Sequence, residues 1–159
     1  RQRQMCIRDR IYTDGAAKGN PGPGGFGVVM RSGEHEKEIS SGFFHTTNNR
    51  MELLAVIVAL ESLKRKRSQV LVYSDSKYVV DAINKKWVDK WKKRSWLRVK
   101  NPDLWKRLLK VLNEHNVTFF WIKGHNDHPQ NERCDQLAVQ ASHSPTMEDS
   151  GYLKKNTLF

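Results

Sequence analysis

Four acidic side chains adjoin apolar stretches of the sequence and could together bind metal ions. Asp14 follows Ile-Tyr-Thr, Asp75 follows Val-Leu-Val-Tyr-Ser, Glu52 lies in an apolar helical pattern, and Asp135 follows Arg-Cys. Carboxylates seldom lie against a core without a partner, and when they gather in one place they repel and their pKa values rise. Divalent cations relieve that repulsion, and Mg²⁺ prefers oxygen ligands. Taken singly, each acid is equally well explained as a turn, cap or helix-terminal residue.

The segments around these acids alternate between strand and helix patterns. Strand patterns cover residues 11–14, 26–30, 36–44, 70–73 and 117–122, and helical patterns cover residues 48–66, 76–83, 101–113 and 131–141. Residues 15–25 are rich in glycine and proline and are predicted to form a turn or loop. Hairpins followed by helical crossovers predict an α/β fold with a mixed sheet. Asp14 and Asp75 each end a predicted strand, so we expect them at the same edge of the sheet.

The overall charge favours a polyanionic partner. The 159 residues carry a formal net charge of +11, an excess typical of nucleic-acid-binding proteins, although a basic surface can also be merely well solvated. Two cysteines, Cys6 and Cys134, are too few for a disulfide framework or a zinc site. No stretch is long and apolar enough for a membrane helix, and no secretory signal is visible. These features predict a cytoplasmic protein with no membrane partner.

Residues 85–100 form the strongest charge feature. The segment holds eight basic residues and one acid, for a net charge of +7, and three of the five tryptophans. Trp87 and Trp91 are four positions apart and would share a helix face. Basic residues beside exposed aromatic rings suit a nucleic-acid backbone. The alternative is a solvated helix whose tryptophans pack inward.

Four motifs, in order, resemble those of bacterial type 1 ribonuclease H. They are Tyr12-Thr13-Asp14-Gly15, Thr47-Asn48-Asn49-Arg50-Met51-Glu52, Tyr73-Ser74-Asp75-Ser76, and Lys123-Gly124-His125 followed by Asn131-Glu132-Arg133-Cys134-Asp135. The resemblance runs from about Ile11 to Ala141. It implies a ribonuclease H-like five-stranded mixed β-sheet flanked by helices. It also implies two Mg²⁺ ions, which Mn²⁺ could replace, and hydrolysis of the RNA strand of RNA–DNA hybrids to leave 3′-hydroxyl and 5′-phosphate ends.

The resemblance also implies roles for individual residues. The metal ligands would be Asp14, Glu52, Asp75 and Asp135, and His125 would assist proton transfer or product release. The hybrid would contact Asn20, Thr47, Asn48, Asn49, Lys77, Trp87, Trp91, Lys92, Lys93, Arg94 and Asn101. Thr47 and Asn101 match a pocket for a DNA phosphate. Lys77 replaces the family's glutamine, which puts one minor-groove contact in doubt.

The sequence is expected to form one catalytic domain, residues 11–142, and a monomer. Residues 1–10 are interpreted as a non-native extension, and residues 143–159 as an irregular C-terminal tail. Two other function classes compete with the nuclease: a non-catalytic hybrid-binding module and a fragment of a polymerase-associated relative. Four intact acids argue against a pure binder, since negative charge beside phosphates hinders binding. The chain has no room for a polymerase domain.

Overall fold

One mixed sheet forms the centre of the protein. The computed structural model describes residues 9–64, 69–123 and 128–156. The strands are β1 (Asp9–Ala17), β2 (Gly22–Ser32), β3 (His35–Thr46), β4 (Gln69–Ser74) and β5 (Asn116–Trp121), arranged in the order β3-β2-β1-β4-β5. The β1–β2 and β2–β3 pairs are antiparallel, whereas β4 is parallel to both β1 and β5. The predicted five-stranded mixed sheet is therefore confirmed.

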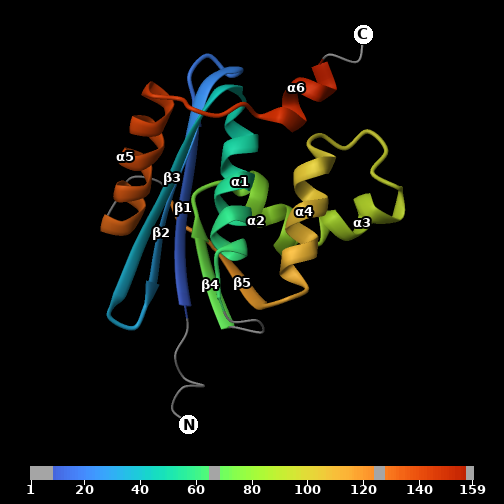
Figure 1. The fold of residues 1–159 in the computed structure, drawn as a ribbon. Coiled ribbons are helices and arrows are strands. Elements are labelled where there is room, and N and C mark those ends of the chain that lie inside the picture. Colours follow the sequence, from blue (N-terminus) through green and yellow to red (C-terminus); the bar gives the residue numbers. More distant parts are fainter. Residues whose placement is uncertain (1–8, 65–68, 124–127, 157–159) are drawn as a thin grey trace.

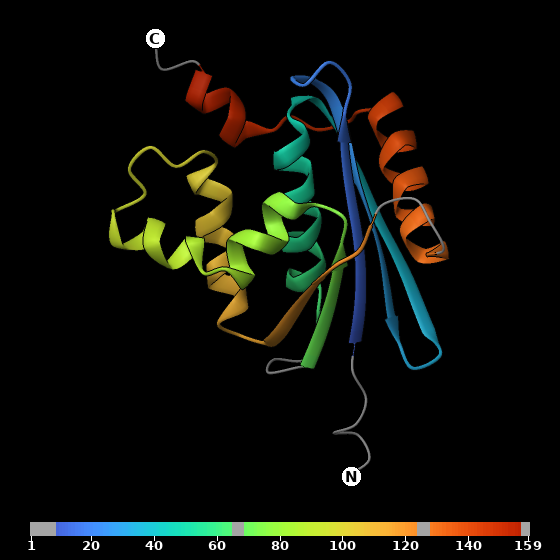
Figure 2. The same ribbon diagram turned by 180° about the vertical axis from the view of Figure 1, so that it is seen from behind.

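Helices cover both faces of the sheet. They are α1 (Asn48–Glu61), α2 (Lys77–Asn84), α3 (Trp87–Lys93), α4 (Pro102–Leu112), α5 (Pro129–His143) and α6 (Ser150–Asn156). Helix α5 packs alone on one face, while α1 to α4 lie on the other (Figures 1 and 2). Within the described ranges, no helix has both the length and the apolar character that crossing a bilayer requires.

Helix α1 is the core of the helical layer. Its residues are buried nearly all round, including Met51, Leu53 and Ile57, as its broad apolar pattern predicted. Its first turn is capped by the Thr47 hydroxyl, which accepts from the Arg50 N–H at 3.3 Å. The helix ends at Glu61 rather than at the predicted Lys66. The Ser62 hydroxyl donates to the Ala59 carbonyl at 2.7 Å, a local bond that competes with further helix.

The glycine-rich segment is mostly strand, so the predicted loop over residues 15–25 is wrong. Strand β1 continues to Ala17 and β2 begins at Gly22, which leaves only residues 18–21 as the connection. Glycines hide the alternating strand pattern because they have no side chains. They are needed here because α5 lies very close to β2: a Cβ at Gly27 would overlap the Cys134 carbonyl oxygen. Asp14 therefore lies within β1 and not at its end.

The C-terminal segment packs on the domain. Residues 143–159 were predicted to be irregular, but they include the end of α5 and all of α6. The Met147 N–H donates to the Gly42 carbonyl at 3.1 Å, and the Met147 carbonyl accepts from the Phe44 N–H at 2.9 Å. Both bonds attach this segment to β3. At the other end of the chain, β1 begins at Asp9, within the stretch interpreted as an extension.

Candidate metal centre and nucleic-acid interface

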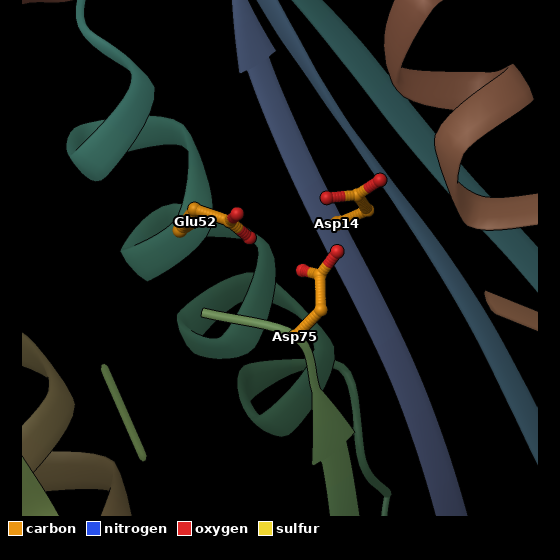
Figure 3. Close-up of side chains that lie close together, drawn as sticks. All are labelled: Asp14, Glu52 and Asp75. Atoms are coloured by element: carbon orange, nitrogen blue, oxygen red, sulfur yellow. The ribbon is translucent and has the colours of Figure 1, made fainter. Parts of the chain in front are cut away.

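Three carboxylates converge between β1, β4 and α1. Asp14, Glu52 and Asp75 each offer an oxygen, and these atoms all lie within 4.8 Å of one another. Figure 3 shows the three side chains turned toward a common point. We call these three residues the acidic cluster. They are far apart in the sequence, so only the fold brings them together.

Strand pairing and a glycine explain this convergence. In the parallel pair of β1 and β4, Thr13 lies opposite Ser74, so the following residues, Asp14 and Asp75, are neighbours. Glu52 approaches from α1 because β1 has a glycine next to Asp14. A Cβ at Gly15 would lie 2.5 Å from the backbone nitrogen of Glu52, a distance that no larger residue tolerates. Gly15 thus permits the close contact of helix and strand that completes the cluster.

The electrostatics of the acidic cluster fit a bound cation. Burial, together with the charges of Asp75 and Asp135, raises the pKa of Asp14 to about 8. Burial, together with the charges of Asp14 and Asp75, raises the pKa of Glu52 well above its ordinary value. The Glu52 Oε1 atom is buried and has no hydrogen-bond partner in the described part of the chain. Oxygen ligands with excess negative charge and an unsatisfied buried acceptor are what a hard divalent cation requires.

Asp135 borders the acidic cluster from α5. It contributes charge and a side-chain hydrogen bond to the raised pKa of Asp14, so it is close to that residue across the sheet face. It lies in the second turn of α5, which begins at Pro129. His125, the fifth predicted catalytic residue, lies outside the described residues.

Polar residues predicted to bind the hybrid gather around the start of α1. The Asn20 Oδ1 atom accepts from the Asn48 N–H, and the Asn48 Oδ1 atom accepts from the Ala17 N–H, both at 2.9 Å. Asn49 is exposed beside them, and Thr47 caps the helix. The 18–21 connection and the α1 N-terminus therefore form one polar surface next to Glu52.

A buried arginine links this surface to α4 and to the C-terminal segment. Arg50 is 2% exposed and forms ion pairs of 2.7 Å with both Asp103 and Asp149. It also donates to the Asn101 side chain at 3.2 Å, while its backbone N–H donates to the Thr47 hydroxyl, so both residues of the predicted phosphate pocket contact Arg50. We call Arg50, Asp103 and Asp149 the arginine cluster. No motif in the sequence predicts this cluster, although a charged residue in an otherwise apolar helix is a signal that partners exist.

The basic segment lies at the periphery of the molecule. Helix α3 and the residues after it lie beyond α4, away from the sheet (Figures 1 and 2). Lys92, Lys93 and Arg94 are all exposed. The two tryptophans do not share an environment: Trp87 is 38% exposed, whereas Trp91 is half-buried with its ring centroid 5.3 Å from that of Trp105. Trp91 therefore has a packing role, as the alternative of inward tryptophans predicted.

Lys77 lies beside a residue that the sequence analysis did not single out. It is exposed at the start of α2, and its ammonium lies 4.6 Å from the ring centroid of Trp121. The indole N–H of Trp121 donates to the Asp75 carbonyl at 3.2 Å. No pattern in the sequence connects Trp121 with Asp75 or Lys77, because β5 and the β4–α2 turn meet only in the folded sheet.

Comparison with known proteins gives a consistent result. Residues 8–143 match the family model described as RNase H. A ribonuclease H of Desulforamulus reducens is 60% identical over 142 residues, which cover 86% of this chain and 89% of that protein. The crystal structure of LC9-RNase H1, a type 1 RNase H with the type 2 active-site motif, is 31% identical with a TM-score of 0.79 and covers 95% of this chain and 81% of its own. LC11-RNase H1 in complex with an RNA/DNA hybrid is 31% identical with a TM-score of 0.63, over 85% of this chain and 96% of its own.

Proposed function

The chain belongs to the ribonuclease H family and is an enzyme that cleaves RNA in RNA–DNA hybrids; we propose that four carboxylates perform this cleavage with two divalent cations. The ligands would be Asp14, Glu52, Asp75 and Asp135, and the ions Mg²⁺, with Mn²⁺ as a substitute. The observation that carries this proposal is the approach of the acidic-cluster oxygens to within 4.8 Å of one another. Like charges held this close need a counterion.

The protein's own residues would orient the reaction. Bound cations supply charge that stabilises the attacking and leaving oxygens of an in-line phosphodiester displacement. Glu52 projects from α1 and faces Asp14 on β1 and Asp75 at the end of β4, so one helix and two strands would set the positions of the carboxylates. His125 would assist proton transfer or product release, since an imidazole titrates near neutral pH. The products would carry 3′-hydroxyl and 5′-phosphate ends.

We assign recognition of the hybrid to two surfaces. Asn20, Asn48 and Asn49 would contact the RNA strand near its 2′-hydroxyls, the groups that distinguish RNA from DNA. Thr47 and Asn101 would hold a DNA phosphate, supported by their common neighbour Arg50. Lys77 would meet the minor groove next to the cleavage site, which is supported by its contact with Trp121, whose indole N–H donates to the Asp75 carbonyl.

The second surface is the basic segment, which would grip the DNA strand. Lys92, Lys93 and Arg94 are exposed, and Trp87 presents its ring beside the Lys85 ammonium, 5.5 Å from the centroid. Binding should weaken steeply as the salt concentration rises. The logarithm of the binding constant should fall with the logarithm of the salt concentration, with a slope of about −0.9 per neutralised phosphate. Replacing the three basic residues by Ala should flatten that slope, measured by fluorescence anisotropy with a labelled hybrid in Ca²⁺. An unchanged slope would mean that this segment faces away from the substrate.

The direct test is cleavage of an end-labelled RNA–DNA hybrid in Mg²⁺. We expect the hybrid to be cut in its RNA strand only, with 5′-phosphate and 3′-hydroxyl ends, and no cutting of duplex RNA or duplex DNA. Asp75→Asn keeps the side-chain shape and removes a charge that the cations need. If Asp75→Asn retained near-normal turnover, the metal assignment would be wrong. Binding without cleavage by the unaltered chain would favour the hybrid-binding module.

We further propose that the protein acts as a monomer in the bacterial cytoplasm. The basic surface and the site lie on one domain, so one chain carries all the groups that the reaction needs. A sedimentation measurement with and without hybrid would test this proposal.

A further inference from the structure

The turn that carries Asp75 is held by a side chain from another strand. The last backbone bond of the β4–β5 pair runs from the Ile122 N–H to the Ser74 carbonyl at 2.9 Å, and the first turn of α2 begins with the Val80 N–H and the Ser76 carbonyl at 3.1 Å. The Asp75 carbonyl lies between the sheet and the helix. It accepts from the indole N–H of Trp121 at 3.2 Å, so a side chain provides the donor where the strand pairing stops.

Trp121 is well placed to hold this turn. It is the last residue of β5 and lies opposite Ser74, the last residue of β4. Trp121 is 43% exposed, and its ring also lies under the Lys77 ammonium. The indole therefore contacts a residue on each side of Ser76. Both contacts are with the turn between β4 and α2. Asp75 lies in this turn, just after β4, and its side chain points toward Asp14 (Figure 3).

We propose that Trp121 is a positioning residue for the metal centre: its indole N–H holds the Asp75 backbone so that the carboxylate meets Asp14 and Glu52. An aspartate side chain has only two torsions, so a shift of its backbone moves the carboxylate directly. Repulsion within the acidic cluster acts to push Asp75 outward, and the hydrogen bond to its carbonyl resists that movement. The inference rests on the proposed function, because it takes Asp75 to be a metal ligand.

The test is Trp121→Phe, which keeps an aromatic ring beneath Lys77 and removes the donor. We expect the dissociation constant for Mg²⁺, measured by calorimetry on the full chain without substrate, to rise about 5-fold, the effect of one ordinary hydrogen bond. The Mg²⁺ concentration for half-maximal hybrid cleavage should rise by the same factor. KM for the hybrid at saturating Mg²⁺ should stay unchanged, because the substrate does not need this donor.

The matched control is Trp96→Phe. Trp96 also lies under a lysine, with the Lys106 ammonium 5.9 Å from its ring centroid, but it has no contact with the acidic cluster among the described interactions. This variant should bind Mg²⁺ like the unaltered protein. Both variants are titrated at 10 °C and checked by circular dichroism, so that a loss of stability cannot be mistaken for a loss of metal affinity.

Two results would overturn the inference. One is an unchanged Mg²⁺ affinity in Trp121→Phe. The other is a raised KM for the hybrid with unchanged Mg²⁺ affinity, which would make Trp121 a substrate contact. Failure of the proposed function is distinct from both: the unaltered chain would then neither bind Mg²⁺ nor cleave the hybrid.

Discussion

Helix α1 contributes to two charge clusters of different composition within its first two turns. Glu52 belongs to the acidic cluster, where like charges raise the pKa values of Glu52 and Asp14. Arg50, two residues earlier, forms ion pairs with two aspartates, Asp103 and Asp149. Burial opposes ionisation of Asp103, but hydrogen bonds from Arg50 outweigh it and lower its pKa. The arginine cluster thus has a cation of its own beside its two carboxylates, whereas the acidic cluster is three carboxylates that offer oxygens to an ion.

The two clusters also differ in what they hold together. The Arg50 guanidinium bonds Asp103 on α4 and Asp149 just before α6, and Asp149 also accepts from the Thr46 hydroxyl at 2.6 Å. These bonds join segments of the chain and contribute to stability. The acidic cluster joins β1, β4 and α1 at a cost in repulsion. The contrast indicates that a cluster of acids with its own cation is structural and one without a cation is functional, and four predictions test it.

The largest effect is expected from Asp14→Asn. Loss of this charge should lower kcat for hybrid cleavage by at least about 1000-fold, since metal-ion stabilisation of the transition state is worth several kcal/mol. The same variant without Mg²⁺ should be at least as stable as the unaltered protein, because repulsion is relieved. Hybrid cleavage and metal-free urea denaturation measure the two quantities. A variant that lost stability as well as activity would remove the contrast between the clusters.

Arg50→Met, unlike Asp14→Asn, should lower the stability of the protein. It leaves Asp149, 6% exposed, without its cation, so the free energy of unfolding should fall by about 3 kcal/mol in urea denaturation. The matched control is Arg107→Met, which breaks the 2.6 Å ion pair with Glu61, whose side chains are 45% and 38% exposed. That exposed pair should be worth less than about 1 kcal/mol. Equal losses in the two variants would show that burial of the pair is unimportant.

The pH dependence of stability should reveal the repulsion within the acidic cluster. The pKa of Asp14 is raised to about 8, so its protonated form stabilises the fold below pH 4 and this stabilisation is lost as pH rises through about 8. Metal-free unfolding free energy should therefore fall by at least about 1 kcal/mol between pH 5 and pH 9. Asp14→Asn should reduce this slope, and saturating Mg²⁺ should abolish it. A slope unaffected by either change would contradict the assignment to the cluster.

The arginine cluster should respond at the acid end of the range and with a smaller effect. Asp103 has a lowered pKa, so its contribution is present above the ordinary carboxyl pKa near 3.8 and is lost as pH falls further. Because its side chain is 45% exposed, the loss should be below about 1 kcal/mol. Urea denaturation of Asp103→Asn and the unaltered protein between pH 2 and pH 5 should show the two curves converging in acid. Parallel curves would mean that Asp103 contributes no ionic stabilisation.

Much of the fold was predictable because it depends on local periodicity. The apolar pattern of α1, the two strand patterns that became β2 and β3, and the helical pattern that became α2 are all read from neighbouring residues, and all are present in the structure. The failures occur where neighbours are uninformative. Glycines between Gly15 and Gly27 hide two strands. Their positions are set by the close packing of α1 and α5 against the strands, and not by any local pattern.

The candidate site divides in the same way. The sequence alone determined which side chains are acidic, which segments carry them and which family motifs they complete. Tertiary structure decided that Asp14 lies beside Asp75 and Glu52, that Arg50 meets Asp149 99 positions later, and that Trp121 reaches the Asp75 carbonyl. The physical reason is that charge interactions and hydrogen bonds depend on distance in space, and only strand register and helix packing set that distance for residues far apart in the chain.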